Sequence, residues 1–202
     1  NYLNEGGVVI TTESKKKNPV TIYAESTPNP GVQKFVAKKN LVSQTFEFTS
    51  IEDAKLSPFA TALFQFPFVK AVFIDKNYVS VTKFDIVEWN DIYSEIRSFI
   101  SSYLQENKII IKELPKSNST TNNPKEKEDD IINFEGTSAK SVAILDEYIR
   151  PAVASDGGNI AFKSYDQDTK IVSVILQGAC SGCPSSTITL KNGIETMLQV
   201  EV

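Results

Sequence analysis

Residues 178 to 190 read GACSGCPSSTITL and contain both cysteines of the 202-residue chain. The preceding residues, KIVSVILQG, have the apolar pattern of a strand. Pro184 follows the second cysteine and favours the first turn of a helix, where its missing N–H would have no partner. Cys180 and Cys183 are therefore predicted to lie in a loop between a strand and a helix.

The residues upstream of this loop complete a small α+β unit. Residues 138 to 154 predict a helix with Val142, Leu145 and Ile149 on one face, and Pro151 is expected to break or bend it. A turn and a strand follow in SDGGNIAFKSYD, so the predicted order is helix, strand, strand, helix. The apolar positions of the last predicted helix are Ile188, Ile194, Met197 and Leu198.

Two thiols at this spacing suit a reversible disulfide, half of a zinc site or half of an iron–sulfur site. The chain contains no histidine and no third cysteine, so it offers only two ligands of the usual kinds. Two chains that each donated Cys180 and Cys183 would supply four. The partial positive charge at a helix N-terminus would stabilise the thiolates. Buried structural cysteines are the remaining alternative.

The first half of the chain predicts a separate α+β unit without obvious catalytic chemistry. The segment VTIYAES alternates like a strand, and the prolines and glycine of TPNPG force a loop after it. QKFVA and SQTFEF are further short strand candidates, and residues 69 to 84 predict a hairpin that turns at Lys76 and Asn77. Ser57 and Pro58 open a predicted helix that runs to Phe66. In a second helix, from residue 89 to 104, one apolar stripe holds Ile92, Ile96, Phe99, Ile100 and Tyr103.

A polar segment separates the two units. Residues 112 to 133 read KELPKSNSTTNNPKEKEDDIIN, which has too few apolar side chains to offset the entropy of folding. The predicted organisation is a leader or processing remnant at 1–17, an N-terminal domain at 18–111, a flexible linker at 112–136 and a C-terminal domain at 137–202. The linker is expected to leave the two domains free to reorient.

Composition excludes several classes of function. The formal net charge of −4 argues against a protein that binds nucleic acid electrostatically. No apolar run is long enough to cross a membrane. Two cysteines at one site are too few to cross-link a secreted domain of this size, so a reducing compartment is expected.

Two separate motifs give the C-terminal half a family resemblance. LDEYIRPAVASDGGNIAF, followed by LQGACSGCPSSTITLKNGIETML, closely resembles the cluster-binding domain of the NifU-like (Nfu) iron–sulfur proteins. The segment VTIYAESTPNPGVQKFVA resembles the start of that family's N-terminal domain, which shares the TPNP element. The chain is thus similar to the two-domain Nfu proteins along both halves.

The resemblance implies a carrier or scaffold for iron–sulfur clusters, not an enzyme. It implies that Cys180 and Cys183 of two protomers hold one [4Fe–4S] cluster, so that the loaded protein is a homodimer. The expected partners are upstream cluster-assembly proteins and apo iron–sulfur proteins that receive the cluster, with no nucleic acid and no membrane. Because the cluster has to be released, the site is expected to be accessible to solvent.

The resemblance also assigns the neighbouring motifs. Asp156, Gly157 and Gly158 match the family's DGG turn and are expected to shape the start of the following strand, while Arg150 and Pro151 match an IRP motif with a structural role. A dithiol oxidoreductase and a zinc-stabilised interaction module stay open as alternative functions. A bacterial cytoplasm is the expected compartment, with the mitochondrial matrix as the alternative.

Overall fold

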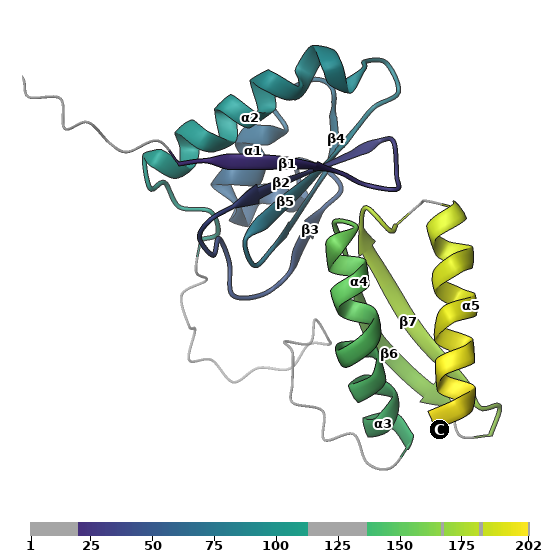
Figure 1. Ribbon diagram of the computed structural model, residues 1–202. Coiled ribbons are helices and arrows are strands. Elements are labelled where there is room, and N and C mark those ends of the chain that lie inside the picture. The colour runs from purple at the N-terminus through teal and green to yellow at the C-terminus, as the bar shows by residue number, and fades with distance from the viewer. Residues whose placement is uncertain (1–19, 113–136, 167, 182–183, 202) are drawn as a thin grey trace, which may run out of the picture.

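The computed structural model describes residues 20–112, 137–166, 168–181 and 184–201. These residues form two α+β units, each with its own sheet and its own hydrophobic core (Figure 1). The predicted fold class, two small α+β domains, is confirmed. The predicted linker falls almost entirely outside the described residues, and the exact domain boundaries stay a prediction.

The N-terminal domain is built on a five-stranded antiparallel sheet with the order β1-β2-β5-β4-β3. Its strands are β1 (Ile22–Ser26), β2 (Val32–Ala37), β3 (Phe46–Phe48), β4 (Val69–Asp75) and β5 (Tyr78–Lys83). Its helices are the 3-10 turn η1 (Asp53–Leu56), α1 (Pro58–Leu63) and α2 (Trp89–Gln105).

The two α-helices cover one face of this sheet. Successive side chains of a strand point to opposite faces, so every second residue of each strand faces the helices. Inward-facing residues of β4 and β5 join buried residues of α2 in one core; among them are Val72, Ile74, Val79, Val81, Ile92, Ile96 and Ile100. The predicted apolar stripe of the second helix is confirmed as the packing face, with Phe99 only partly buried. The hairpin β4–β5 and its turn at Lys76 and Asn77 also form as predicted.

The helix predicted from Ser57 begins as expected and ends early. Ser57 Oγ accepts a hydrogen bond from the backbone N–H of Ala60 at 3.0 Å, and Pro58 occupies the first turn. The α-helix stops at Leu63, and turns continue to Phe66 before Pro67. The prediction of a helix through Phe66 was therefore three residues too long.

The C-terminal domain has the predicted order of helix, strand, strand and helix. Its elements are α3 (Thr137–Ile144), the π-helical turn η2 (Leu145–Ile149), α4 (Arg150–Ser155), β6 (Gly158–Asp166), β7 (Ile171–Gly178) and α5 (Pro184–Glu201). Pro151 has no N–H to donate to the carbonyl four residues earlier, which accounts for the widened turn before it. The predicted irregularity at Pro151 is confirmed.

The core of this domain lies between its helices and one face of the β6–β7 hairpin. Leu145, Ile149 and Ile194 are buried there. Ile188, one of the apolar positions of the predicted helix, is exposed, and Leu190 packs against the core. Met197 is also exposed, and the side chain of Leu198 lies outside the described residues. Across the described parts of the chain, none of the helices combines the length and apolarity that crossing a membrane requires.

Candidate functional site

The cysteine loop lies where the sequence places it. Strand β7 ends at Gly178, the helix α5 begins at Pro184, and Cys180 lies between them. Gly178 has φ of +64°, a backbone conformation that side chains other than glycine rarely adopt. Cys183 is the second predicted ligand and lies outside the described residues.

Cys180 is buried, with 1% of its surface exposed. It belongs to the core of the C-terminal domain, together with Leu145, Val153 and Ile160. The expectation of a solvent-accessible site is therefore wrong for Cys180 in this structure. The reason is that its side chain packs into the apolar core of the C-terminal domain and not toward solvent.

The DGG turn forms the support for Cys180. A Cβ added to Gly158 would lie 2.9 Å from Cys180 Sγ and 2.6 Å from the backbone carbonyl of Gln177. Gly157 has φ of +82°, and its carbonyl accepts a hydrogen bond of 3.2 Å from the N–H of Ala179. The turn therefore does more than begin a strand, because its backbone lies directly against the cysteine loop.

Residues of the N-terminal domain bind the same end of the C-terminal domain. Ser80 Oγ donates a 2.7 Å hydrogen bond to the carbonyl of Gly157, and the Tyr78 hydroxyl donates one of 2.8 Å to the carbonyl of Gly158. Both come from the face of β5 that points away from α1 and α2. These bonds join the two domains, whereas freely reorienting domains were expected from the polar linker.

The TPNP loop contacts the cysteine loop directly. Asn29 Nδ2 donates a 3.1 Å hydrogen bond to the carbonyl of Ala179, the residue before Cys180. The amide of Asn29 is fixed from its other side, since its Oδ1 accepts a 3.0 Å bond from the N–H of Gly31. Glu47 Oε1 accepts a 2.9 Å hydrogen bond from the N–H of Gly178.

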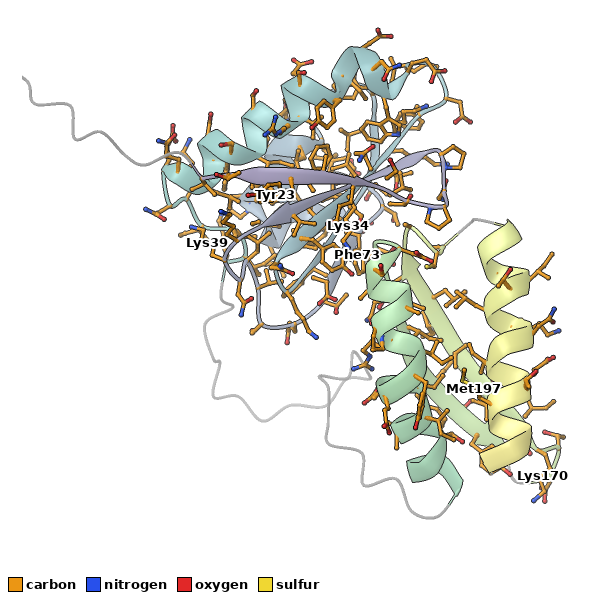
Figure 2. The ribbon with its side chains drawn as sticks, viewed as in Figure 1. Tyr23, Lys34, Lys39, Phe73, Lys170 and Met197 are labelled. Atoms are coloured by element: carbon orange, nitrogen blue, oxygen red, sulfur yellow. The ribbon has the colours of Figure 1, made fainter. Side chains whose placement is uncertain are left out.

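Further contacts extend the interface between the domains. Lys34 Nζ donates a 3.1 Å hydrogen bond to the carbonyl of Ser155, the last residue of α4. The same ammonium lies 3.0 Å from Glu25 Oε2 and 4.8 Å from the centre of the Tyr78 ring. Phe73 is buried between the two domains, and a Cβ added to Gly178 would lie 2.9 Å from its ring. Figure 2 shows Lys34 and Phe73 on the part of the N-terminal domain that faces the C-terminal domain.

Burial changes the acidity of two groups in this interface. The pKa of Tyr78 is raised above its ordinary value, mainly by burial and next by the neighbouring carboxylate of Asp75. Burial also raises the pKa of Glu47, and the hydrogen bond from Gly178 partly opposes that shift. The phenol of Tyr78, neutral at physiological pH as tyrosine ordinarily is, acts as a hydrogen-bond donor to the carbonyl of Gly158.

The donor set determines what this site can bind. Among residues 20–112, 137–166, 168–181 and 184–201, no group of three or more His, Cys, Asp or Glu residues is placed to hold a metal ion. The thiols of Cys180 and Cys183 are soft ligands of the kind that zinc and iron–sulfur clusters take. One chain holds two such ligands, so a four-ligand site requires a second chain or other thiols.

Two family models match the chain, one for each domain. The model described as Scaffold protein Nfu/NifU N terminal matches residues 22–107, and the NifU-like domain matches residues 142–202. A NifU-like protein of Schizosaccharomyces pombe is 31% identical over 89% of this chain and 68% of its own length. The chain belongs to the two-domain NifU-like (Nfu) family.

Other relatives are similar across both domains. The human protein named NFU1 iron-sulfur cluster scaffold homolog, mitochondrial, is 37% identical over 88% of this chain and 66% of its own length. NifU-like protein 4, mitochondrial, of Arabidopsis thaliana is 34% identical over 91% of this chain and 63% of its own length. The chain thus spans slightly less than two thirds of these two relatives.

The residues of the N-terminal domain that contact the cysteine loop were not predicted from the sequence. A signal was present in β4, where Phe73 occupies the face opposite to Val72 and Ile74. A large apolar residue on the outer face of a sheet indicates that something covers that face. Nothing comparable in the sequence distinguishes Asn29 or Ser80 from ordinary loop and strand residues.

Proposed function

We propose that this chain is an iron–sulfur cluster scaffold and carrier, in which Cys180 and Cys183 of two protomers hold one [4Fe–4S] cluster. The proposal depends chiefly on the loop between β7 and α5, because it contains both thiols of the chain within the segment matched as a NifU-like domain. A cubane cluster takes four thiolates, and two chains supply them. The name of the human relative, an iron-sulfur cluster scaffold homolog, supports the same role.

The loaded protein would pass its cluster to apo iron–sulfur proteins and receive it from upstream assembly proteins. A carrier needs ligands and a route for release, and it needs no catalytic acid or base. The human and Arabidopsis relatives carry the word mitochondrial in their names, so we place the chain in the mitochondrial matrix. The relatives named here lend no support to the first expectation, a bacterial cytoplasm.

Anaerobic reconstitution of the full chain with iron and sulfide tests the proposal. We expect broad visible absorbance, about four iron atoms per two chains, and loss of both when oxygen or a chelator is added. A protein that remains colourless and iron-free under these conditions would contradict the cluster assignment.

The same preparation separates the two alternatives. A zinc-stabilised module would bind one zinc ion tightly per two chains and take up no sulfide. A dithiol oxidoreductase would reduce insulin disulfides without added metal.

A further inference from the structure

The outer face of the N-terminal sheet is buried although neither helix of that domain covers it. Lys34, Phe73, Tyr78 and Ser80 all lie on this face, and each is less than 9% exposed. Three of the four are polar, and each of these donates a hydrogen bond to a backbone carbonyl between Ser155 and Gly158. A polar face that is desolvated and fully hydrogen-bonded in this way is a specific docking surface.

The occupant of this surface is the end of the C-terminal domain that carries the cysteine loop. Glu47 accepts a hydrogen bond from the N–H of Gly178, and Asn29 donates one to the carbonyl of Ala179. Gly178 and Ala179 are the two residues that precede Cys180. Docking therefore fixes the backbone of the loop at the point from which the proposed ligand extends.

Cys180 has to change its surroundings before it can serve as a ligand. Its side chain is 1% exposed in the apolar core and lies beneath Gly158. A sulfur that bridges to the iron of a second protomer has to leave this position. The contacts from Asn29 and Glu47 hold the backbone of Ala179 and Gly178, so they oppose any movement of the loop that accompanies this change.

We infer that the outer face of the N-terminal sheet and the TPNP loop form a closing surface for the chain's own cysteine loop. Release of this surface precedes cluster binding, so docking of the two domains and cluster-bridged dimerisation exclude one another. Only the statement about cluster binding and dimerisation depends on the proposed function. The docking itself is a property of the apo protein and is tested without iron.

Asn29→Asp is the sharpest test of the closing surface. Aspartate keeps the Oδ1 that accepts from Gly31, and it replaces the donor to Ala179 with an oxygen that faces a carbonyl. The matched control is Asn77→Asp, because Asn77 Nδ2 donates a 3.3 Å bond to the carbonyl of Ala37 within the N-terminal domain. Both variants lose one amide donor and gain one charge.

The measurement is the alkylation rate of Cys180 in the reduced, metal-free full chain, resolved by peptide mass spectrometry. We expect Asn29→Asp to raise the rate roughly tenfold over the unchanged protein, and Asn77→Asp to leave it unchanged. Equal rates in all three proteins would overturn the inference. A rate in the unchanged protein that falls as its concentration rises would show that a second copy closes the loop, which overturns the assignment within one chain.

Ser80→Ala repeats the test if Asn29→Asp disturbs folding. It removes the donor to Gly157, while its control, Ser101→Ala, removes a 2.6 Å bond to the carbonyl of Val20 away from the interface. We expect a severalfold faster alkylation of Cys180 for Ser80→Ala alone. Unfolding is monitored by circular dichroism, so a general loss of structure is distinguished from opening.

Reconstitution then tests the link to the cluster. Asn29→Asp is expected to acquire the cluster faster than the Asn77→Asp control and to reach the same final iron content. Faster alkylation with equal rates of cluster uptake would overturn the coupling. If the unchanged protein binds no cluster while the alkylation difference persists, the proposed function fails and the closing surface stands.

Discussion

The hydroxyl of Tyr78 and the carbonyl of Gly158 are 80 positions apart in the chain and form a buried hydrogen bond of 2.8 Å. The bond connects the outer face of one sheet to the turn that supports Cys180 in the other domain. The hydroxyl of Tyr78 is protonated at neutral pH, as tyrosine ordinarily is, and burial raises its pKa further, so it remains a donor. The geometry of the cysteine loop is therefore determined by both domains.

Tyr78→Phe should weaken the contact between the domains while leaving each domain folded. The ring keeps its packing, but the carbonyl of Gly158 loses its partner, at a cost of about 1 kcal/mol. We expect amide resonances of residues 155–158 and 178–179 to shift in the full chain, and those of α2 to stay in place. Tyr23→Phe is the matched control, because Tyr23 is 48% exposed and lies next to Lys38. Identical spectra for the two variants would contradict the prediction.

Gly158→Ala should destabilise the C-terminal domain. Its Cβ would lie 2.6 Å from a backbone oxygen and 2.9 Å from Cys180 Sγ, and neither can move without a shift of the loop. We expect a loss of about 1–3 kcal/mol in the free energy of unfolding, as is usual for overpacked sites. Denaturant unfolding measures it.

Gly193→Ala is the control for this prediction. Gly193 lies inside α5, and an added Cβ meets nothing within 4 Å. Alanine in a helix interior is more favourable than glycine by about 1 kcal/mol, so this variant should be slightly more stable. A Gly158→Ala protein as stable as Gly193→Ala would show that the loop relaxes without cost.

The elements of each domain follow from local sequence, and the relation between the domains does not. The hairpin β4–β5, the helix α2 and the irregularity at Pro151 each have a pattern that is complete within a short window. The Asn29–Ala179 hydrogen bond, across 150 positions, has no such local signature. The exposure of the apolar Ile188 has another cause: Leu190 and Ile194, four residues apart on one face of α5, supply the contact of that helix with the core.

The sequence indicated the burial of Cys180 only as an alternative, and the reason is related. The sequence shows a glycine-rich loop before a helix, which is typical of an exposed ligand site. Whether the side chain points outward or into the core depends on how closely the turn at Gly158 approaches it. That approach is a tertiary contact and leaves no pattern in the loop itself.

The docking of the domains should strengthen as the pH falls. Burial in the docked state raises the pKa of Glu47, so that state binds a proton more readily than an open state with an exposed carboxylate. The docked state begins to gain stability as the pH falls to the raised pKa of Glu47, and this gain is complete below the ordinary value of 4.5. Solution scattering of the apo protein between neutral and mildly acidic pH should show progressive compaction.

Glu47→Gln provides the control for this pH dependence. Its amide oxygen still accepts from the N–H of Gly178, but the side chain no longer titrates. We expect this variant to be compact already at neutral pH and to show little further compaction as the pH falls to 4.5. If Glu47→Gln follows the same curve as the unchanged protein, another group is responsible.

Replacing either cysteine should abolish stable cluster binding, since the chain holds no third cysteine and no histidine. Cys180→Ser also places a hydroxyl in an apolar core, at a cost of about 1–3 kcal/mol, so Cys180→Ala is the better variant. Iron and sulfide analysis after reconstitution measures the loss. A Cys183→Ser protein that retains a full cluster would refute the ligand assignment.

Cluster loading should convert a monomer into a dimer, and removal of the cluster should reverse the change. One chain supplies two thiolates, so a cubane cluster keeps two iron atoms without protein ligands until a second chain approaches. The helix N-terminus beside each cysteine loop offsets part of the negative charge that the four thiolates bring together. We expect sedimentation of monomeric apo protein at micromolar concentration, of a dimer after reconstitution, and of a monomer again after chelation. A monomer that carries a complete [4Fe–4S] cluster would require two ligands from small thiols such as glutathione, and the bridging arrangement would then be wrong.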